Sequence, residues 1–550
     1  MKYGDLEGAD GKTPNEACCA CGGGFNPNMI PPKEEEEDDG MELNGAKIIL
    51  EEARYNKSFV DAEVEGLDAL KATLAPFDPG KVAAHAGIDS EQLVKAAHML
   101  SGWKRGSISV GTGPNMSGFG NATEYLNLAL TSLMGHWRQA GEVKQNSGVF
   151  ITPAPAIAAS PGPMPAWGFG RKMRVRDLEE SASGLPTGAL ADEILTPGEG
   201  QIKALICLGG NPMLAWPDQI KTYEAMQALD LLVCFDPRMS KTCELADYII
   251  APKLHYEIKG CTAAPELFGM FGAGWGFEGP YGQVSDPILD VPEGSDLCEE
   301  YQFIHRVATE MNKTLNVKSF ALFGDPQEQD RQATPVPPGE TPDPMASWSI
   351  SLRGSPVAIS DAFDDPEAHR GKMFDRPPTT VEPKPDDWQG KLDIGNPSML
   401  AELEEISQRL AQSDSLDDQD YPFRMISRRI NEVLNSSWHE DPVQSKRVGH
   451  HPAFIHPDDL ADLGLSDGQV VEIESARAMI SCVAKAASEV RPGCVAIPHS
   501  WGTSPNEKED PLGQGGNTGR LSFSDRDFDR RTGIPRMSSI PIRVRAAAAG

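Results

Sequence analysis

Several features that would place a protein quickly are missing from this 550-residue sequence. No stretch approaches the ~20 uninterrupted apolar residues that a membrane span needs. The N-terminus, MKYGDLEGAD, lacks the basic and apolar segments of a secretory signal. Basic residues are scarce, with 50 Lys and Arg against 81 Asp and Glu, and the net charge of -31 argues against an exposed nucleic-acid surface. The composition therefore predicts a soluble protein with no membrane span and no nucleic-acid partner.

Cysteine is also sparse, because ten residues in a chain of this length cannot form a disulfide-stapled scaffold. Seven of them are spaced singly, which is typical of a reducing compartment and predicts a cytoplasmic protein. The other three, Cys18, Cys19 and Cys21, precede the acidic run Glu34–Asp39. This composition predicts that residues 1–43 form a disordered Cys-rich tail and acidic linker. Cys18 and Cys21 have the spacing of a zinc or thiol-exchange pair, but no second pair or nearby histidine supports that use.

The familiar catalytic motifs are absent as well. The sequence contains no H-E-x-x-H, no G-x-S-x-G, no P-loop and no G-x-G-x-x-G. The 11 histidines are scattered, and a lone histidine is more often structural than catalytic. The sequence therefore does not favour a standard hydrolase or a P-loop nucleotide-binding protein.

Apolar periodicity divides the rest of the chain into four regions. Helices are expected over 48–60, 91–100 and 124–134, with a short strand at 107–110, so residues 44–150 are predicted to be a helical and α/β region. Residues 151–323 contain alternating strands and helices, and residues 324–420 are a Pro- and Asp-rich excursion that ends in a helix over 398–412. Residues 421–550 form the last region.

The clearest α/β unit lies in the second region. Ala204–Leu208 (ALICL) and Leu231–Phe235 (LLVCF) are predicted to be buried strands, with a third at Tyr248–Ala251. An amphipathic helix is expected over Pro217–Leu229, between the first two. Short apolar strands alternating with helices predict an α/β fold with a parallel Rossmann-like sheet and flanking helices.

The last region changes to short strands separated by turns such as Asp467-Gly468. The strands are expected at Phe423–Ser427, Val470–Ile473, Ile480–Ala484, Val495–Pro498 and Ile540–Val544. Closely spaced short strands with turn signals predict a small barrel.

One candidate ligand site follows from the parallel sheet alone. Ligands bind outside the carboxyl ends of parallel strands, where loops present backbone N–H groups. Gly209 and Gly210 allow a phosphate to approach the backbone, Asn211 offers a donor and an acceptor, and Asp236 ends the next strand. The spacing from Asn211 to Asp236 is near the ~20-residue offset of the acidic residue in dinucleotide folds. The alternative is a tight turn followed by a helix cap, which the same residues also favour.

An ordered series of sequence blocks resembles the molybdopterin-dependent oxidoreductases of the dimethyl sulfoxide reductase and formate dehydrogenase superfamily. The resemblance extends from about Leu43 to Arg545 and corresponds to the C-terminal two-thirds of such proteins. The blocks are Gly111–Glu124 (GTGPNMSGFGNATE), Met134–Gly141 (MGHWRQAG), Leu185–Glu193 (LPTGALADE), Ile206–Pro212 (ICLGGNP), Phe235–Ala251 (FDPRMSKTCELADYIIA), His456–Ser475, Arg491–Gly502 (RPGCVAIPHSWG) and Gly533–Arg545 (GIPRMSSIPIRVR).

The resemblance implies that the last region is a six-stranded double-psi-type barrel that binds a molybdopterin dinucleotide. It also implies a bis-molybdopterin guanine dinucleotide cofactor with molybdenum or tungsten, which oxidises or reduces a small-molecule substrate by two electrons. The implied cofactor-binding residues fall into three groups. They are Gly111 and Gly113 in the Gly-rich loop; Gly209, Asn211, Pro212, Asp236 and Arg238 at the phosphate, ribose and guanosine; and Arg428, Arg429, Asn435, Ser436, His499, Trp501 and Asn517 along the pterin at the barrel entrance.

The sequence departs from the family pattern at its N-terminal end. Members begin with an iron–sulfur cysteine motif and a first Rossmann-like half that carries the metal ligand, and no matching segment is found here. The resemblance therefore assigns neither an iron–sulfur cluster, nor a catalytic residue, nor a metal ligand to this chain. Two alternatives to an oxidoreductase polypeptide remain: a catalytically incomplete fragment or subunit that needs a complementing polypeptide or electron-transfer partner, and a generic Rossmann dehydrogenase.

Overall fold

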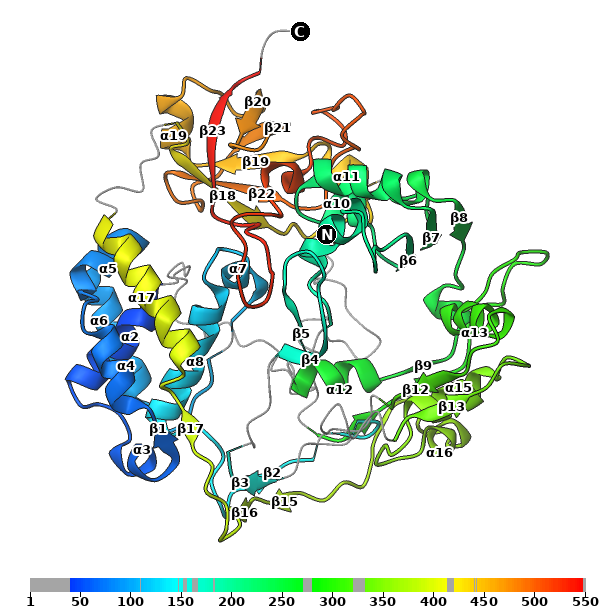
Figure 1. Ribbon diagram of the computed structural model, residues 1–550, viewed down its shortest axis with the longest axis horizontal. Coiled ribbons are helices and arrows are strands. Elements are labelled where there is room, and N and C mark those ends of the chain that lie inside the picture. Colours follow the sequence, from blue (N-terminus) through cyan, green and yellow to red (C-terminus); the bar gives the residue numbers. More distant parts are fainter. Residues whose placement is uncertain are drawn as a thin grey trace, which may run out of the picture.

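The computed structural model describes residues 40–108, 110–146, 148–151, 156–160, 167–181, 184–270, 279–319, 332–412, 420–439, 441 and 443–547. The predicted Cys-rich tail and acidic linker therefore lie outside the described residues, apart from the positions at which helix α2 begins at Gly40. Figure 1 shows the described chain as a barrel at the top, a helical layer on the left, a small parallel sheet at the upper right and a mixed region below it.

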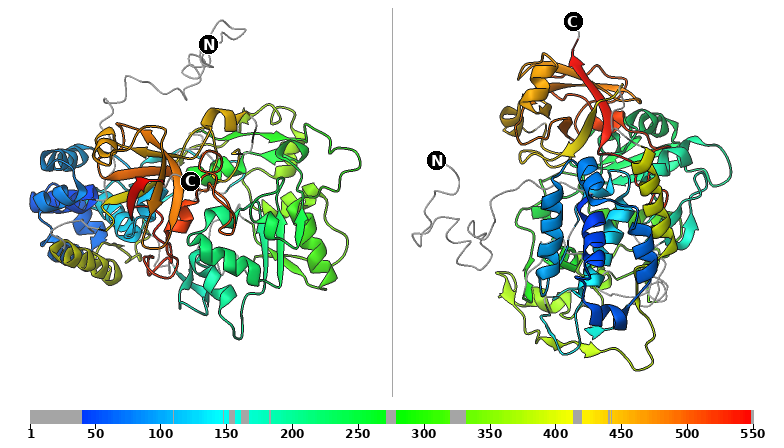
Figure 2. Two further views of the ribbon diagram at one scale, coloured as in Figure 1. Left: turned by 90° about the horizontal axis from the view of Figure 1, so that it is seen from above. Right: turned by 90° about the vertical axis from the view of Figure 1, so that its left-hand side faces the viewer.

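The helical layer is built from amphipathic segments that share one apolar core. Leu70, Leu126 and Leu403 are almost fully buried in this core, which joins helices from both ends of the sequence. Figure 2 shows these helices side by side in the right-hand view. The helices are α2 (Gly40–Glu51), α3 (Lys57–Glu63), α4 (Leu67–Leu74), α5 (Pro79–Ala86), α6 (Ser90–Gly102), α8 (Gly120–Met134) and α17 (Pro397–Gln412).

Most of the expected helices in this layer are present, and one expected strand is not. The helix predicted over 124–134 begins earlier, at Gly120, and the one predicted over 48–60 is interrupted between α2 and α3. The prediction of a strand at 107–110 was wrong for the described residues of that run, since 107, 108 and 110 belong to no strand. The turn that follows opens the short helix α7 (Thr112–Asn115).

The predicted parallel sheet is confirmed, with strand order β6-β7-β8. β6 (Ala204–Leu208) and β7 (Leu231–Phe235) have the predicted bounds, and β8 is Tyr248–Ile250. Helices α10 (Pro212–Ala215) and α11 (Gln219–Ala228) lie between β6 and β7 in the chain, and α13 (Glu300–Glu310) brings Phe303 against Phe235 with ring centroids 4.8 Å apart. β7 is buried as expected, but β6 is not, because Ala204, Ile206 and Leu208 are exposed.

The mixed region below the sheet has its own small core around Phe150, Leu352 and Ile359. It includes α12 (Ala263–Met270), α15 (Pro344–Ser351) and α16 (Ile359–Asp364). Four two-stranded pairs join distant parts of the chain: β1 (Val64–Glu65) with β17 (Leu392–Asp393), β2 (Val143–Lys144) with β15 (Thr379–Thr380), β3 (Ile157–Ala158) with β16 (Glu382–Pro383), and β10 (Tyr281–Gly282) with β14 (Lys372–Met373). Three more pair nearby segments: β4 (Trp167–Lys172) with β5 (Glu179–Ser181), β9 (Gly260–Cys261) with β11 (Val284–Ser285), and β12 (Leu315–Val317) with β13 (Thr334–Val336).

The predicted six-stranded barrel is confirmed and closed, with strand order β18-β22-β19-β21-β20-β23. Inward-facing side chains such as Met425, Ile473 and Ile497 fill it. Five strands match the predicted runs within a few residues, and the sixth is β19, which begins at a proline. The strands are β18 (Phe423–Arg428), β19 (Pro452–Ile455), β20 (Val470–Glu474), β21 (Met479–Ala486), β22 (Cys494–Pro498) and β23 (Ile540–Ala546).

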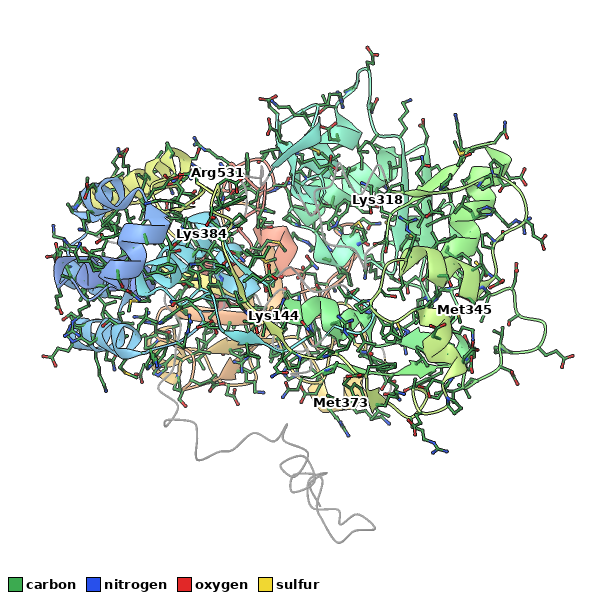
Figure 3. The ribbon with its side chains drawn as sticks, turned by 90° about the horizontal axis from the view of Figure 1, so that it is seen from below. Lys144, Lys318, Met345, Met373, Lys384 and Arg531 are labelled. Carbon is green, nitrogen blue, oxygen red and sulfur yellow. The ribbon has the colours of Figure 1, made fainter. Side chains whose placement is uncertain are left out.

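An ion pair holds the C-terminal segment against the helical layer. Arg531 donates to the buried carboxylate of Glu402 on α17 at 2.7 Å. Figure 3, seen from below, shows Arg531 beside this helix, and Lys384, which pairs with Glu63 of α3 at 2.7 Å, on the same side of the molecule. None of the helices in the described ranges combines the length and apolar character of a membrane crossing.

Candidate functional site

The carboxyl ends of β6 and β7 lie next to each other. The two strands pair in register up to Leu208 and Phe235, and the N–H of Gly209 donates to the carbonyl of Phe235 at 3.0 Å. Gly209 has φ +60°, a conformation that glycine adopts without a steric cost. The turn after β6 and the acidic loop after β7 therefore share one edge of the sheet, where ligands bind in open α/β sheets.

The side chain of Asn211 stabilises the turn after β6 through hydrogen bonds to Thr242. Its Oδ1 accepts hydrogen bonds from the Thr242 hydroxyl at 2.8 Å and the Thr242 N–H at 3.3 Å. The same hydroxyl accepts from the N–H of Met213 at 3.1 Å. Pro212 occupies the first position of α10, where its missing N–H costs nothing. The buried Thr242 thus fixes both loops, a positioning role that no motif in the sequence indicated.

Asp236 presents a carboxylate at this edge. It is half-buried, and its Oδ1 accepts from the N–H of Arg238 at 3.0 Å, which makes a local turn. Within the described residues, its second oxygen has no hydrogen-bond donor, so it can accept from a ligand. The exposed guanidinium of Arg238 has no carboxylate partner in the part of the chain that the structure describes.

A hydrogen-bonded cluster forms the entrance of the barrel. Arg429 donates to Oδ1 of Asn435 at 2.7 Å, and Nε2 of His499 lies 3.0 Å from the same oxygen. Arg428 stacks on the ring of Phe454 at 3.8 Å and lies 3.4 Å from the Glu489 carboxylate. Burial and the charge of Arg429 lower the pKa of His499, whose Nδ1 lies 3.3 Å from the carbonyl of Arg428.

Trp501 forms the inner wall behind this cluster. Its ring stacks on His451 at 4.9 Å and meets the edge of His439 at 4.3 Å. Nε2 of His439 lies 2.8 Å from the carbonyl of Asn435. Ser436 follows in a tight turn whose ends, Leu434 and Ser437, are paired. The sequence did not indicate His439, because it lies in no recognisable motif.

Asn517 joins the barrel to the sheet unit. It is fully buried, and its amide donates to the carbonyl of Trp501 at 2.7 Å and to the carbonyl of Leu214 at 2.9 Å. Arg520 reinforces this junction by donating to Gln219 at the start of α11, 2.9 Å away. The barrel and the strand ends are therefore held in one fixed relation.

The loop after β7 and the barrel entrance meet at a cation–π contact. The guanidinium carbon of Arg238 lies 5.6 Å from the centre of the Trp438 ring. This contact joins residues that are 200 positions apart. It places the barrel entrance next to the sheet edge that carries the Gly209 turn and the Asp236 carboxylate. The cations Arg238, Arg428 and Arg429 concentrate positive charge there, although the chain as a whole is strongly acidic.

Three buried polar atoms of the barrel segments in this area have no protein partner within the described residues. They are Nε1 of Trp501, Oγ1 of Thr503 and Oδ1 of Asn517. Buried polar groups are normally hydrogen-bonded, so these atoms indicate a ligand rich in donors and acceptors. Together with the three arginines and the second oxygen of Asp236, they fit a pterin nucleotide.

Gly111 and Gly113 are not brought to this area by any contact in the described structure. They lie at the start of α7, and a Cβ on either would meet nothing within 4 Å. The end of α7 contacts the barrel, since the carbonyl of Met116 accepts from the N–H groups of Met537 and Ser538 at 2.9 and 3.1 Å. No group of three or more His, Cys, Asp or Glu residues in the described ranges could hold a metal ion.

Comparison with known proteins identifies the family. The model described as "Molybdopterin oxidoreductase" matches residues 31–261, and the one described as "Molydopterin dinucleotide binding domain" matches residues 423–541. The chain belongs to the molybdopterin oxidoreductase family. The resemblance noted in the sequence is thereby confirmed, and the barrel is its dinucleotide-binding domain.

Individual relatives are distant. The chain is 21% identical to acetylene hydratase of Syntrophotalea acetylenica over 91% of its own length and 68% of that protein. It is 23% identical to the F420-dependent formate dehydrogenase 2 subunit alpha of Methanococcus maripaludis, covering 82% of this chain and 61% of the relative. It is 22% identical to the trimethylamine-N-oxide reductase of Haemophilus influenzae, covering 87% and 60%. The chain thus spans about three fifths to two thirds of the length of these relatives.

A solved structure has the same fold. Acetylene hydratase from Pelobacter acetylenicus aligns with a TM-score of 0.64 at 18% identity, over 92% of this chain and 70% of that one. This likeness supports the α/β architecture with a C-terminal barrel.

Proposed function

We propose that this chain binds a bis-molybdopterin guanine dinucleotide, with molybdenum or tungsten, and takes part in the two-electron oxidation or reduction of a small substrate. The observation that carries this proposal is the junction of the two strand-end loops with the barrel entrance, where Arg238 meets Trp438. Family membership supports the cofactor class. When bound, the metal–dithiolene group would supply the redox chemistry.

The residues of this chain have separable roles in the proposal. The Gly209 turn offers close backbone approach to a phosphate, and the cations Arg428 and Arg429 offset its charge. The free oxygen of Asp236 accepts from the donor edge of guanine. The unpartnered atoms of Trp501 and Asn517 bind polar edges of the pterin and exclude water from it.

We propose the same division into regions as the sequence predicts: a helical region over 44–150, a Rossmann-like unit over 151–323, an excursion over 324–420 and the barrel from 421.

Seven cysteines in the described residues are free thiols: Cys207, Cys234, Cys243, Cys261, Cys298, Cys482 and Cys494. Free thiols are typical of a reducing compartment and support a cytoplasmic location. The proposal includes an electron-transfer partner or a complementing polypeptide. The exposed apolar face of β6 favours a complementing polypeptide.

The experiment is to purify the full chain from a host that makes the cofactor, and to measure its metal content by mass spectrometry and its GMP after acid hydrolysis. We expect molybdenum or tungsten together with GMP in a ratio of about two GMP per metal, as a bis-dinucleotide requires. Asp236→Asn should lower the GMP content because it replaces one acceptor oxygen with an NH2 group, which cannot accept from the guanine donors, and removes the negative charge. Asp230→Asn, an exposed control whose carboxylate pairs with Lys203 at 3.3 Å, should not. Protein that carries neither metal nor GMP would overturn the proposal.

A further inference from the structure

Three of the free thiols lie together in the core of the parallel sheet. Cys207 and Cys234 are register partners on the neighbouring strands β6 and β7, and they share one small apolar core with Cys243. Gly209 and Asp236 each follow one of the paired cysteines by two positions. A chemical change at these thiols would therefore act directly on the strand ends.

The spacing of the two strands allows a bond between the two sulfur atoms. Neighbouring strands lie about 4.8 Å apart, and the Cα atoms of a disulfide usually lie about 4.4–6.8 Å apart. Register partners direct their side chains to the same face of a sheet, and a hydrogen bond already joins the thiols of Cys207 and Cys234. Two cysteines placed in this way can be linked with little movement of the backbone.

The three thiols differ in reactivity. The hydrogen bond with Cys234 lowers the pKa of Cys207, whereas that same bond and burial raise the pKa of Cys234. Burial also raises the pKa of Cys243, whose sulfur accepts from the Ser240 hydroxyl at 3.2 Å. Cys207 is the most exposed of the three, at 7% against 1% and 2%, and lies on an edge strand. Because the thiolate is the nucleophilic form of cysteine, Cys207 is the thiol that reacts first.

We propose that Cys207 and Cys234 form a reversible redox pair, which hydrogen peroxide oxidises to a disulfide between β6 and β7. The Cys207 thiolate attacks one peroxide oxygen, the O–O bond breaks, and the products are the sulfenic acid of Cys207 and hydroxide. The sulfur of Cys234 then attacks the sulfenic sulfur, and the hydroxyl group leaves as water with the thiol proton. The two sulfur atoms lose two electrons, which the peroxide gains.

The disulfide is reversible by exchange with small thiols. Two molecules of a thiol such as glutathione reduce it and leave as their own disulfide. Disulfides of this transient kind serve as redox sensors in reducing compartments. The redox pair is independent of the proposed cofactor, because neither thiol is assigned to cofactor binding.

The bond should tighten the sheet edge that carries the candidate site. The N–H of Gly209 donates to the carbonyl of Phe235 at 3.0 Å, directly beyond the paired cysteines. A covalent link between the strands opposes their separation, so hydrogen exchange at Gly209 should be slower in the oxidised protein than in the reduced protein. Exchange that is unchanged or faster would contradict this effect on the site.

The test is a peptide map of the full chain after treatment with hydrogen peroxide under native conditions. Remaining thiols are blocked with N-ethylmaleimide, and trypsin then places the three cysteines in separate peptides, 204–221, 222–238 and 242–253. We expect a disulfide between peptides 204–221 and 222–238 that dithiothreitol separates. A map without a cross-link, or with either peptide linked to 242–253 instead, would overturn the pair.

Serine variants identify the order of the two steps. Cys234→Ser should leave Cys207 as a sulfenic acid, which dimedone labels on peptide 204–221. Cys207→Ser should abolish the cross-link, and dimedone on peptide 222–238 of this variant would show that Cys207 is not the first thiol to react. Cys298→Ser, at a half-buried thiol beside Asp296 and Glu300, is the matched control and should leave the cross-link unchanged. The wild-type map decides the cross-link by itself if a serine variant fails to fold.

Discussion

At the scale of single residues, His451 shows how far burial can suppress a charge. The side chain is fully buried in the barrel, stacked on Trp501, with its Nε2 2.7 Å from the carbonyl of Pro498. Burial lowers the pKa of His451 to about 3. The folded protein therefore holds this imidazole neutral at pH values where the unfolded chain protonates it.

This linkage predicts a pH-dependent contribution to stability. The favourable effect of a neutral His451 is present above pH 6.5 and is lost as the pH falls toward 3, by about 1.4 kcal/mol per pH unit. We expect His451→Gln to be less stable than wild type at pH 8, and the difference to shrink between pH 6.5 and 5. Urea unfolding midpoints of both proteins at several pH values would show this. A difference that is constant with pH would contradict a depressed pKa.

At the residue scale, the sequence predicted correctly which residues lie at the strand ends, because a backbone pattern determines that position. Gly209, Asn211 and Asp236 lie at one sheet edge because parallel strands in register bring their carboxyl ends together. Trp438 and His439 could not be found in this way, since their importance comes from contacts with residues distant in the sequence. Gly111 and Gly113 gained no contact with that edge in the described structure.

At the scale of elements, β6 is an edge strand of the sheet with an exposed apolar face. It lies at the edge of the order β6-β7-β8, and Ile206 and Leu208 are 45% and 47% exposed. Parallel sheets are usually covered on both faces, and an uncharged open edge favours association. The expected burial of β6 was wrong because an apolar run cannot show whether a second layer covers it.

The exposed face predicts self-association or partner binding through β6. We expect Ile206→Lys combined with Leu208→Lys to raise the concentration at which light scattering detects aggregates, without a large change in the free energy of unfolding, because both side chains already face solvent. Met99→Lys on α6, where the side chain is 52% exposed, is the control and should have no comparable effect. If the paired lysines leave aggregation unaltered, β6 is not the associating surface.

At the scale of the whole molecule, hydrogen bonds to the buried carboxylate of Asp529 join the C-terminal segment to the helical layer near the start of the chain. Asp529 accepts from the side-chain amide of Asn121 at 2.8 and 2.9 Å, at the start of α8. It also accepts from the N–H groups of Arg531 and Thr532 at 2.8 and 2.7 Å. The C-terminal segment is thereby fixed against the helical layer.

We expect Asn121→Ala to cost about 1.5–3 kcal/mol, the usual range for hydrogen bonds to a charged group. Hydrogen exchange should increase at the start of α8 and in the segment around Asp529, while the strands of the barrel keep their protection. Asn146→Ala provides a control at a half-buried amide that donates to neutral acceptors, the Thr379 hydroxyl at 2.7 Å and the Pro377 carbonyl at 2.5 Å. Equal loss of protection throughout the barrel would show that Asn121 does not act locally.

The sequence by itself determined the parallel strands, five of the six barrel strands, the closing of the chain in a barrel and the family. These features follow from local apolar periodicity, turn residues and ordered motifs, which depend on neighbours along the chain. The tertiary structure alone decided that Asn517 joins the two units, that Thr242 fixes both strand-end loops and that Arg238 meets Trp438. Those contacts arise only when segments far apart in the chain pack together, and no pattern of neighbouring residues encodes them.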